Sequence, residues 1–134
     1  MQVSLLIDEY RKNWAIRFLR EAKSDLSTAG KTPIPAMSVS FAVMAMRKAQ
    51  TSVYYSIGDP SYVAPIVSEV IEGKRSIENS TLRFLADMEL MIRSCINGGE
   101  RLGKETAIRN AETLIGLASK MVSLVTRSKV AEFA

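Results

Sequence analysis

The sequence predicts an all-α protein, an antiparallel four-helix bundle with one short additional helix, folded as a single domain over residues 1–134. Three observations support this fold class. Apolar residues recur at three- and four-residue spacing through four long segments, glycine and proline separate these segments, and no segment alternates like a half-buried strand. The chain also has the commonest size for one domain with one hydrophobic core.

The first helical pattern runs from about residue 4 to residue 29 and has a regular apolar stripe. The stripe consists of Trp14, Ala15, Phe18, Leu19, Ala22, Leu26 and Ala29. We expect Gly30 to close this helix. Pro33 and Pro35 then prevent it from resuming, because proline lacks the amide donor that a helix needs.

The second pattern, from about residue 36 to residue 57, is apolar on almost every side in its first half. Its apolar residues there are Met37, Val39, Phe41, Ala42, Val43, Met44, Ala45 and Met46. Such a helix must be covered on several sides, so it either fills the middle of the bundle or forms an interface with a second copy of the chain. We expect a homodimer, because one layer of neighbouring helices leaves part of this surface uncovered.

Three further segments complete the fold. A short helix is expected over residues 60–72, and a fourth helix over residues 76–96, where Ile77, Phe84, Leu85, Met88, Met91, Ile92 and Cys95 share one face. The last pattern is the most regular, with Ile108, Ala111, Ile115, Ala118, Val122 and Val125 at alternating spacings of three and four. Helices of similar length joined by short loops favour antiparallel neighbours.

The composition excludes several classes of function. The chain has no histidine, which removes the usual general base and the commonest metal ligand, so we expect neither a metal site nor a cofactor. The single cysteine, Cys95, permits no internal disulfide and is interpreted as a buried apolar residue. No stretch approaches the roughly 20 apolar residues of a membrane span, and we expect a cytoplasmic protein.

Two motif-like segments are interpreted as structural. The residues from Gly98 to Thr106 nearly match the phosphate-binding pattern G-x-x-x-x-G-K-[ST], but Glu105 stands where the hydroxyl should bind magnesium. The segment also follows a predicted helix instead of a strand, so we interpret it as a turn between helices. Asp87 and Glu89 point to different faces of their helix at this spacing, and both are expected to be solvated.

Two pairs of polar residues are candidates for nucleic-acid or nucleotide binding. Arg47 and Lys48 interrupt the most apolar helix, and Arg109 and Asn110 lie in the last helix. Each pair marks either the solvated side of its helix or a functional groove. The net charge of +4 permits only weak attraction to phosphate groups, so RNA or nucleotide binding is expected to be weak.

The order of the helices resembles that of HEPN domains, which are prokaryotic helical bundles often encoded beside nucleotidyltransferases. Residues 14–26 (WAIRFLREAKSDL) look like the opening helix of that family, residues 40–49 (SFAVMAMRKA) are similar to its second helix, and residues 107–115 (AIRNAETLI) resemble its closing helix. Many HEPN proteins are ribonucleases that use an arginine, a polar residue and a histidine. Arg109 and Asn110 match the first two, but Leu114 and Ile115 occupy the place of the histidine.

The resemblance implies a helical bundle, a homodimer and a nucleotidyltransferase or antitoxin-like partner. The sequence therefore favours a non-catalytic HEPN-like interaction module, with Arg47, Lys48, Arg109 and Asn110 as weak RNA or nucleotide contacts and with no catalytic residues. Two alternatives stay open. One is a histidine-free ribonuclease that uses arginines and a tyrosine such as Tyr54, which requires these side chains to converge in one concave pocket. The other is an adaptor that only binds proteins.

Overall fold

The computed structural model describes residues 2–98 and 101–133, and the side chains of residues 9–98 and 101–125. This part of the chain contains five helices and no strand, so the predicted all-α class is confirmed. The helices are α1 (Gln2–Lys31), α2 (Pro35–Ile57), α3 (Pro60–Ile71), α4 (Ser80–Gly98) and α5 (Lys104–Phe133). The short helix is α3, in the predicted place.

The clearest boundary error concerns α4, which begins at Ser80 instead of at residue 76. Asn79 explains the later start, because its Oδ1 atom accepts a hydrogen bond from the Leu82 amide at 2.8 Å and so caps the helix. Ile77 therefore lies outside the helix and is exposed, although the sequence placed it on the apolar face. The phosphate-loop-like segment follows helix α4, as the turn interpretation expected, with Gly99 and Glu100 outside the described residues.

Helices α1, α2 and α5 pack closely because the residues between them are small. Each contributes fully buried alanines at helical spacing, namely Ala15, Ala22 and Ala29 from α1, Ala42, Ala45 and Ala49 from α2, and Ala107, Ala111 and Ala118 from α5. A side chain of one methyl group lets two backbones approach each other, and alanine also has the highest helix propensity. The sequence thus encodes tight packing and helicity with the same residues.

Two buried serines confirm how near α1 and α2 are. The Ser38 hydroxyl donates a hydrogen bond to the backbone carbonyl of Ala29, and the Ser52 hydroxyl donates to that of Ala15, each at 2.6 Å. A side chain as short as serine reaches a neighbouring backbone only where the helices nearly touch. These bonds lie toward opposite ends of α2, so the two helices stay close over most of its length.

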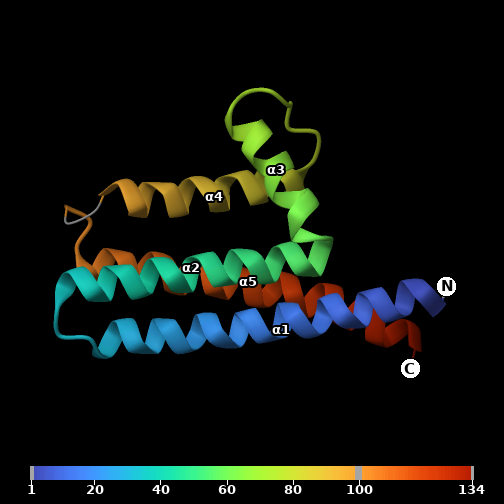
Figure 1. Cartoon of the computed structure of the whole chain (residues 1–134), viewed down its shortest axis with the longest axis horizontal. Helices are drawn as coiled ribbons and strands as arrows, with labels where there is room; N and C mark the ends of the chain where they lie inside the picture. Colours follow the sequence, from blue (N-terminus) through green and yellow to red (C-terminus); the bar gives the residue numbers. More distant parts are fainter. Residues whose placement is uncertain (1, 99–100, 134) are drawn as a thin grey trace.

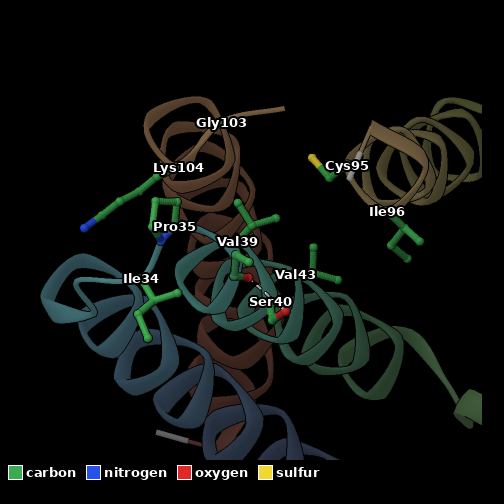
Figure 2. A pocket seen from close by; sticks show the side chains of 10 residues that line it. Ile34, Pro35, Val39, Ser40, Val43, Cys95, Ile96, Gly103 and Lys104 are labelled. Carbon is green, nitrogen blue, oxygen red and sulfur yellow. Dashed lines mark hydrogen bonds between the residues drawn. The ribbon is translucent and has the colours of Figure 1, made fainter. Parts of the chain in front are cut away.

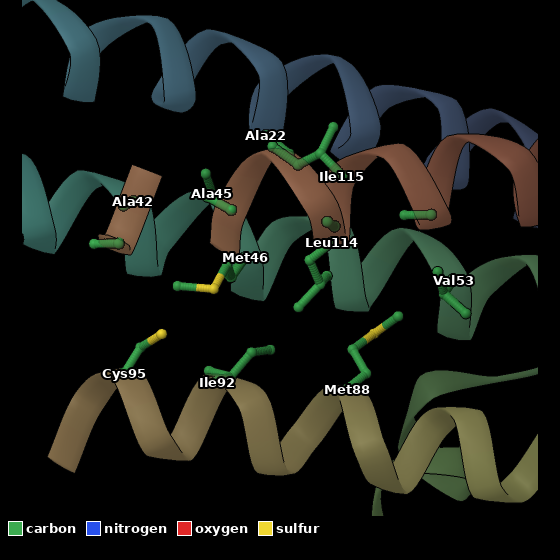
Figure 3. Close-up of a cluster of buried hydrophobic side chains, with 14 of the residues drawn as sticks. Ala22, Ala42, Ala45, Met46, Val53, Met88, Ile92, Cys95, Leu114 and Ile115 are labelled. Atoms are coloured by element: carbon green, nitrogen blue, oxygen red, sulfur yellow. The ribbon is translucent and has the colours of Figure 1, made fainter. Parts of the chain in front are cut away.

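Helix α4 packs against α2 and α5 through larger side chains. In Figure 3, Met88, Ile92 and Cys95 of α4 face Met46, Val53 and Leu114 across a layer of side chains. The ribbon of α4 accordingly lies apart from those of α2 and α5 in Figure 1, with α3 joining α2 to α4 at one end. Because this layer is thicker, a small residue on α4 leaves space that its neighbours do not fill.

The chain reverses direction between its long helices. The end of α1 and the start of α2 lie at one end of the molecule in Figure 1, together with the end of α4 and the start of α5. Helices α1 and α2 are therefore antiparallel, and so are α4 and α5. The turn after α3 depends on Gly73, whose φ of 79° lies in the left-handed region that favours glycine.

Candidate functional site

The adjacent cations Arg47 and Lys48 of α2 point to different neighbouring helices, because successive helical residues are turned by about 100°. The Lys48 ammonium lies 2.8 Å from a carboxylate oxygen of Asp25 on α1. This contact with Asp25 raises the pKa of Lys48, against the opposing effect of burial. The Arg47 guanidinium instead pairs with Glu89 on α4, with 2.6 Å between Nη1 and Oε1. Each cation therefore has its own carboxylate partner.

Glu89 is the centre of a polar cluster that links α4 to α2. Besides its bond to Arg47, its Oε1 atom accepts a hydrogen bond from Gln50 Nε2 at 2.6 Å, and its Oε2 atom accepts one from Arg93 Nε at 2.8 Å. The Gln50 amide also donates to the Tyr54 hydroxyl at 3.0 Å, and its own oxygen accepts from Arg47 at 2.9 Å. We call this set the Glu89 cluster: Arg47, Gln50, Tyr54, Glu89 and Arg93.

The expectation that Glu89 is solvated was wrong, whereas Asp87 is exposed as expected. Only 8% of Glu89 is exposed, because it faces α2 in the middle of the interface. A signal for this was present in the sequence. Glu89 follows Leu85 by four residues and precedes Ile92 by three, which places a carboxylate on the apolar stripe of its own helix. A charge at such a position requires a partner from another helix.

The electrostatics of the cluster keep Glu89 ionised and Tyr54 protonated. Burial alone would raise the pKa of Glu89, but the hydrogen bonds from Arg47, Gln50 and Arg93 outweigh it and the pKa is lowered. Burial raises the pKa of Tyr54 to about 12, and the negative charge of Glu89 adds to this effect. Near neutral pH neither group is close to its pKa, so neither is suited to exchange protons with a substrate.

This geometry does not favour the ribonuclease alternative. Arginines and a tyrosine do converge, as that alternative requires, but they do so inside a helix interface and around a carboxylate that neutralises one of the two guanidinium charges. Tyr54 is buried. None of the residues of the Glu89 cluster lines either of the two hollows described below. The cluster is thus suited to hold α4 against α2.

The four residues predicted from the sequence to bind nucleic acid or a nucleotide lie at different places in the structure. Arg47 lies at the contact of α2 with α4, and Lys48 at the contact of α2 with α1. Asn110 of α5 donates a hydrogen bond to the Cys95 sulfur at 3.4 Å, while Arg109 is exposed on the surface of α5. The structure does not bring the four into one site, and their role in binding stays a prediction.

A cavity of about 670 Å³ lies between α2, α4 and α5, near the end where α2 and α5 begin. Figure 2 shows Val39 and Val43 of α2 on one side of it and Cys95 and Ile96 of α4 on the other. Lys104 is also among the lining residues, and its ammonium group donates a hydrogen bond to the Thr32 carbonyl at 2.9 Å. No pattern in the sequence predicts this cavity.

The other hollow lies on the outside of α2. Met37 and Met44 are 48% and 45% exposed, and a shallow apolar depression runs between them. Farther along the same stripe, the Tyr55 ring stacks on Trp14 and Phe18 of α1, with centroids 6.1 and 5.8 Å apart. We call this surface the outer α2 face: Met37, Phe41, Met44 and Tyr55.

The described residues offer neither a cluster of metal ligands nor a membrane-spanning helix. They contain no group of three or more acidic or cysteine side chains that could hold a metal ion. In the same part of the chain, every helix is too short or too polar to cross a membrane. Comparison of the chain with models of known families, with curated proteins and with solved structures gave no match.

Proposed function

We propose that this protein is a non-catalytic helical interaction module that forms a homodimer through the outer α2 face. The observation that carries the proposal is the pair of half-exposed methionines, Met37 and Met44, on a helix that has no charged residue from residue 35 to residue 46. Methionine adapts its shape to a partner and is common at interaction surfaces. An uncharged, apolar stretch of helix is typical of the centre of an interface.

Neighbouring side chains extend this surface toward the size that a dimer needs. A stable interface buries about 800 Å² on each partner, more than two methionines supply. Phe41 lines the same depression, and Tyr55 continues the stripe toward the exposed Tyr10 of α1. Lys48 interrupts the stripe, but its charge is compensated by Asp25, so it does not repel the same residue of a second copy as an isolated cation would.

The proposal includes the HEPN-like fold, an antiparallel four-helix bundle with α3 as its extra helix, in the cytoplasm of a prokaryote. The antiparallel pairs α1 with α2 and α4 with α5 support it. A nucleotidyltransferase is the proposed protein partner, on the resemblance alone. RNA or nucleotide contacts are proposed to be weak and to involve Arg109 first, because Arg47, Lys48 and Asn110 already contact other residues of the chain.

Light scattering on the purified chain and on two charge variants tests the dimer. The wild type should have about twice its monomer mass of 14.8 kDa. Met37→Glu and Met44→Glu should each shift the mass toward the monomer, because a carboxylate in an apolar interface is desolvated without a partner. Leu117→Glu is the matched control. Leu117 is 43% exposed and belongs to α5, whereas the outer α2 face consists of α2 residues, so its replacement should leave the mass unchanged. A monomeric wild type would refute the proposal.

A further inference from the structure

We propose that two copies of the chain pair their α2 helices in antiparallel orientation, with the two-fold axis at the level of Met46. Met37 of each copy then packs on the aromatic side chains beside Tyr55 of the other. This inference rests on the proposed homodimer and adds the orientation and register of its two copies. Contact along the whole outer α2 face requires that the two helices run either parallel or antiparallel, and the residues along α2 distinguish these orientations.

The outer α2 face belongs to a stripe of six residues whose spacing is symmetric. The stripe consists of Met37, Phe41, Met44, Lys48, Thr51 and Tyr55, at intervals of 4, 3, 4, 3 and 4 residues. This series reads the same in both directions, so an antiparallel pair aligns each member with a member of the second copy. The facing pairs are Met37 with Tyr55, Phe41 with Thr51, and Met44 with Lys48. The spacing thus permits antiparallel pairing, and the chemistry of the facing residues selects it.

The two ends of the stripe differ in character. Met37 and Met44, at one end, are 48% and 45% exposed. At the other end, the Tyr55 ring stacks on Trp14 and Phe18 of α1. Antiparallel pairing places the methionine end of each copy on the aromatic end of the other, a contact that the polarisable sulfur favours. Parallel pairing would place methionine on methionine and lose these sulfur–aromatic contacts.

Lys48 is charged, whereas the other residues of the stripe are neutral. In a parallel pair, the two Lys48 side chains lie directly opposite each other, and like charges are unfavourable at an interface. In the antiparallel pair, Lys48 faces Met44, and the two lysines are offset by four residues, or about 6 Å along the helices. The aliphatic part of Lys48 can then cover the methionine while its ammonium group stays 2.8 Å from Asp25 of its own chain.

Helix α1 also contributes to the proposed interface. The hydrogen bonds of Ser38 and Ser52 to the backbone of α1 fix the register of the two helices, and they place Glu21 at the level of Met46. Glu21 therefore lies beside the proposed axis. Helices α1 and α4 lie on opposite sides of α2 in Figure 1. Antiparallel pairing consequently brings the two α1 helices together, whereas parallel pairing sets α1 of each copy against the α4 side of the other.

The charges of α1 around this axis are complementary. Arg17 precedes Glu21 by four residues and Asp25 follows it by four, so Arg17 of one copy lies at the level of Asp25 of the other. The Arg17 side chain is 66% exposed and contacts Glu21 of its own chain at 3.4 Å. Glu21 also lies 3.5 Å from the Lys48 ammonium, so the two carboxylates beside the axis have cationic neighbours. Opposite charges therefore meet at equal levels, which favours this orientation.

Cross-linking of engineered cysteines tests the orientation. Met37→Cys and Tyr55→Cys are mixed, allowed to exchange subunits and treated with a short thiol-reactive linker. The mixture should give a cross-linked dimer, and each variant alone should not, because equal positions lie 18 residues, or about 27 Å, apart in the antiparallel pair. Phe41→Cys mixed with Thr51→Cys should also cross-link, which covers the case that Tyr55→Cys does not fold. The wild type is the control, since Cys95 is buried.

Light scattering on the same samples separates this inference from the dimer itself. A dimeric sample in which Met37→Cys cross-links with itself would overturn the antiparallel arrangement while the dimer stands. Dimeric samples in which neither mixture cross-links would overturn it as well. A monomeric wild type would refute both the dimer and its orientation.

Reversal of one charge on α1 tests the register. Arg17→Glu should weaken dimerisation roughly tenfold, because it places a carboxylate at the level of Asp25 of the second copy. Lys23→Glu is the matched control, with the same change of charge at an exposed position of α1. Lys23 follows Glu21 by two residues, or about 200° around the helix, and so points away from the axis. Equal dimer affinities of these two variants would contradict the proposed register.

Discussion

Replacing Glu89 by glutamine should destabilise the protein by about 1.5–2 kcal/mol, because Glu89 holds α4 against α2. The side chain keeps its shape in this variant but loses its charge. As a carboxylate it accepts hydrogen bonds from Arg47 and Gln50 at one oxygen and from Arg93 at the other. An amide has only one oxygen, so at least one donor of the cluster then faces the N–H₂ group of the new side chain.

The size of this destabilisation follows from how exposed the hydrogen-bond partners of Glu89 are. A hydrogen bond to a charged group contributes about 1.5–3 kcal/mol, and more is lost where the abandoned donor stays buried. Arg47 and Arg93 are 40% and 41% exposed, so water partly replaces the lost carboxylate and the cost stays at the lower part of that range. Asp87→Asn removes one negative charge from an exposed position of the same helix, and it should change stability by less than about 0.5 kcal/mol.

Urea unfolding of the wild type and both variants, followed by circular dichroism, measures these differences. The account predicts a lower midpoint for Glu89→Gln and an unchanged midpoint for Asp87→Asn. Equal midpoints for the wild type and Glu89→Gln would refute the reasoning, because the carboxylate would then contribute nothing beyond what an amide supplies.

Three further predictions follow from the same cluster and from the residues that the chain lacks. Folding lowers the pKa of the Glu89 carboxyl group, so the ionised carboxylate stabilises the fold above its ordinary pKa of 4.5, and this stabilisation is lost as the pH falls through the lowered pKa. The difference in stability between the wild type and Glu89→Gln should therefore shrink in acid. A difference that stays constant with pH would contradict this prediction. Ultraviolet titration should show a tyrosine with a pKa of about 12 that is missing from Tyr54→Phe, and stability should fall as the pH rises from 10 toward 12. The purified protein should not cleave RNA, and cleavage by the wild type but not by Arg109→Ala would overturn the non-catalytic assignment. Any RNA binding should be weak and lost with salt, because the net charge of the chain is only +4.

The positions of the helices could be predicted from the sequence because their signals are local. The stripe of Ala15, Ala22 and Ala29 lies within one helix, and Pro35 and Pro60 mark the starts of the next two. The start of α4 was missed because the Asn79 cap competes with an apolar residue, Ile77, that extends the pattern upstream.

The candidate sites could be predicted only in part, because they depend on which helices are neighbours. The sequence singled out Arg47 and Tyr54 but gave no reason to pair them with Glu89, since 42 positions separate Arg47 from its partner. The cavity depends on the separation of α4 from α2, which Met88 and Ile92 determine in combination with Met46. No periodicity within a single segment contains that information.

Protection of methionine methyl groups from a soluble paramagnetic probe, measured by NMR at concentrations where the protein is dimeric, tests the central claim most directly. In one chain, Met37 and Met44 are about half exposed, whereas Met46 is fully buried. If the outer α2 face forms the dimer, the methyl signals of Met37 and Met44 should be protected nearly as well as the signal of Met46. In the Met44→Glu variant, the Met37 signal should lose this protection. The proposed interface would be contradicted if the probe weakened the methyl signals of Met37 and Met44 in the wild type at least as strongly as the signal of Met91, which is partly buried within one chain.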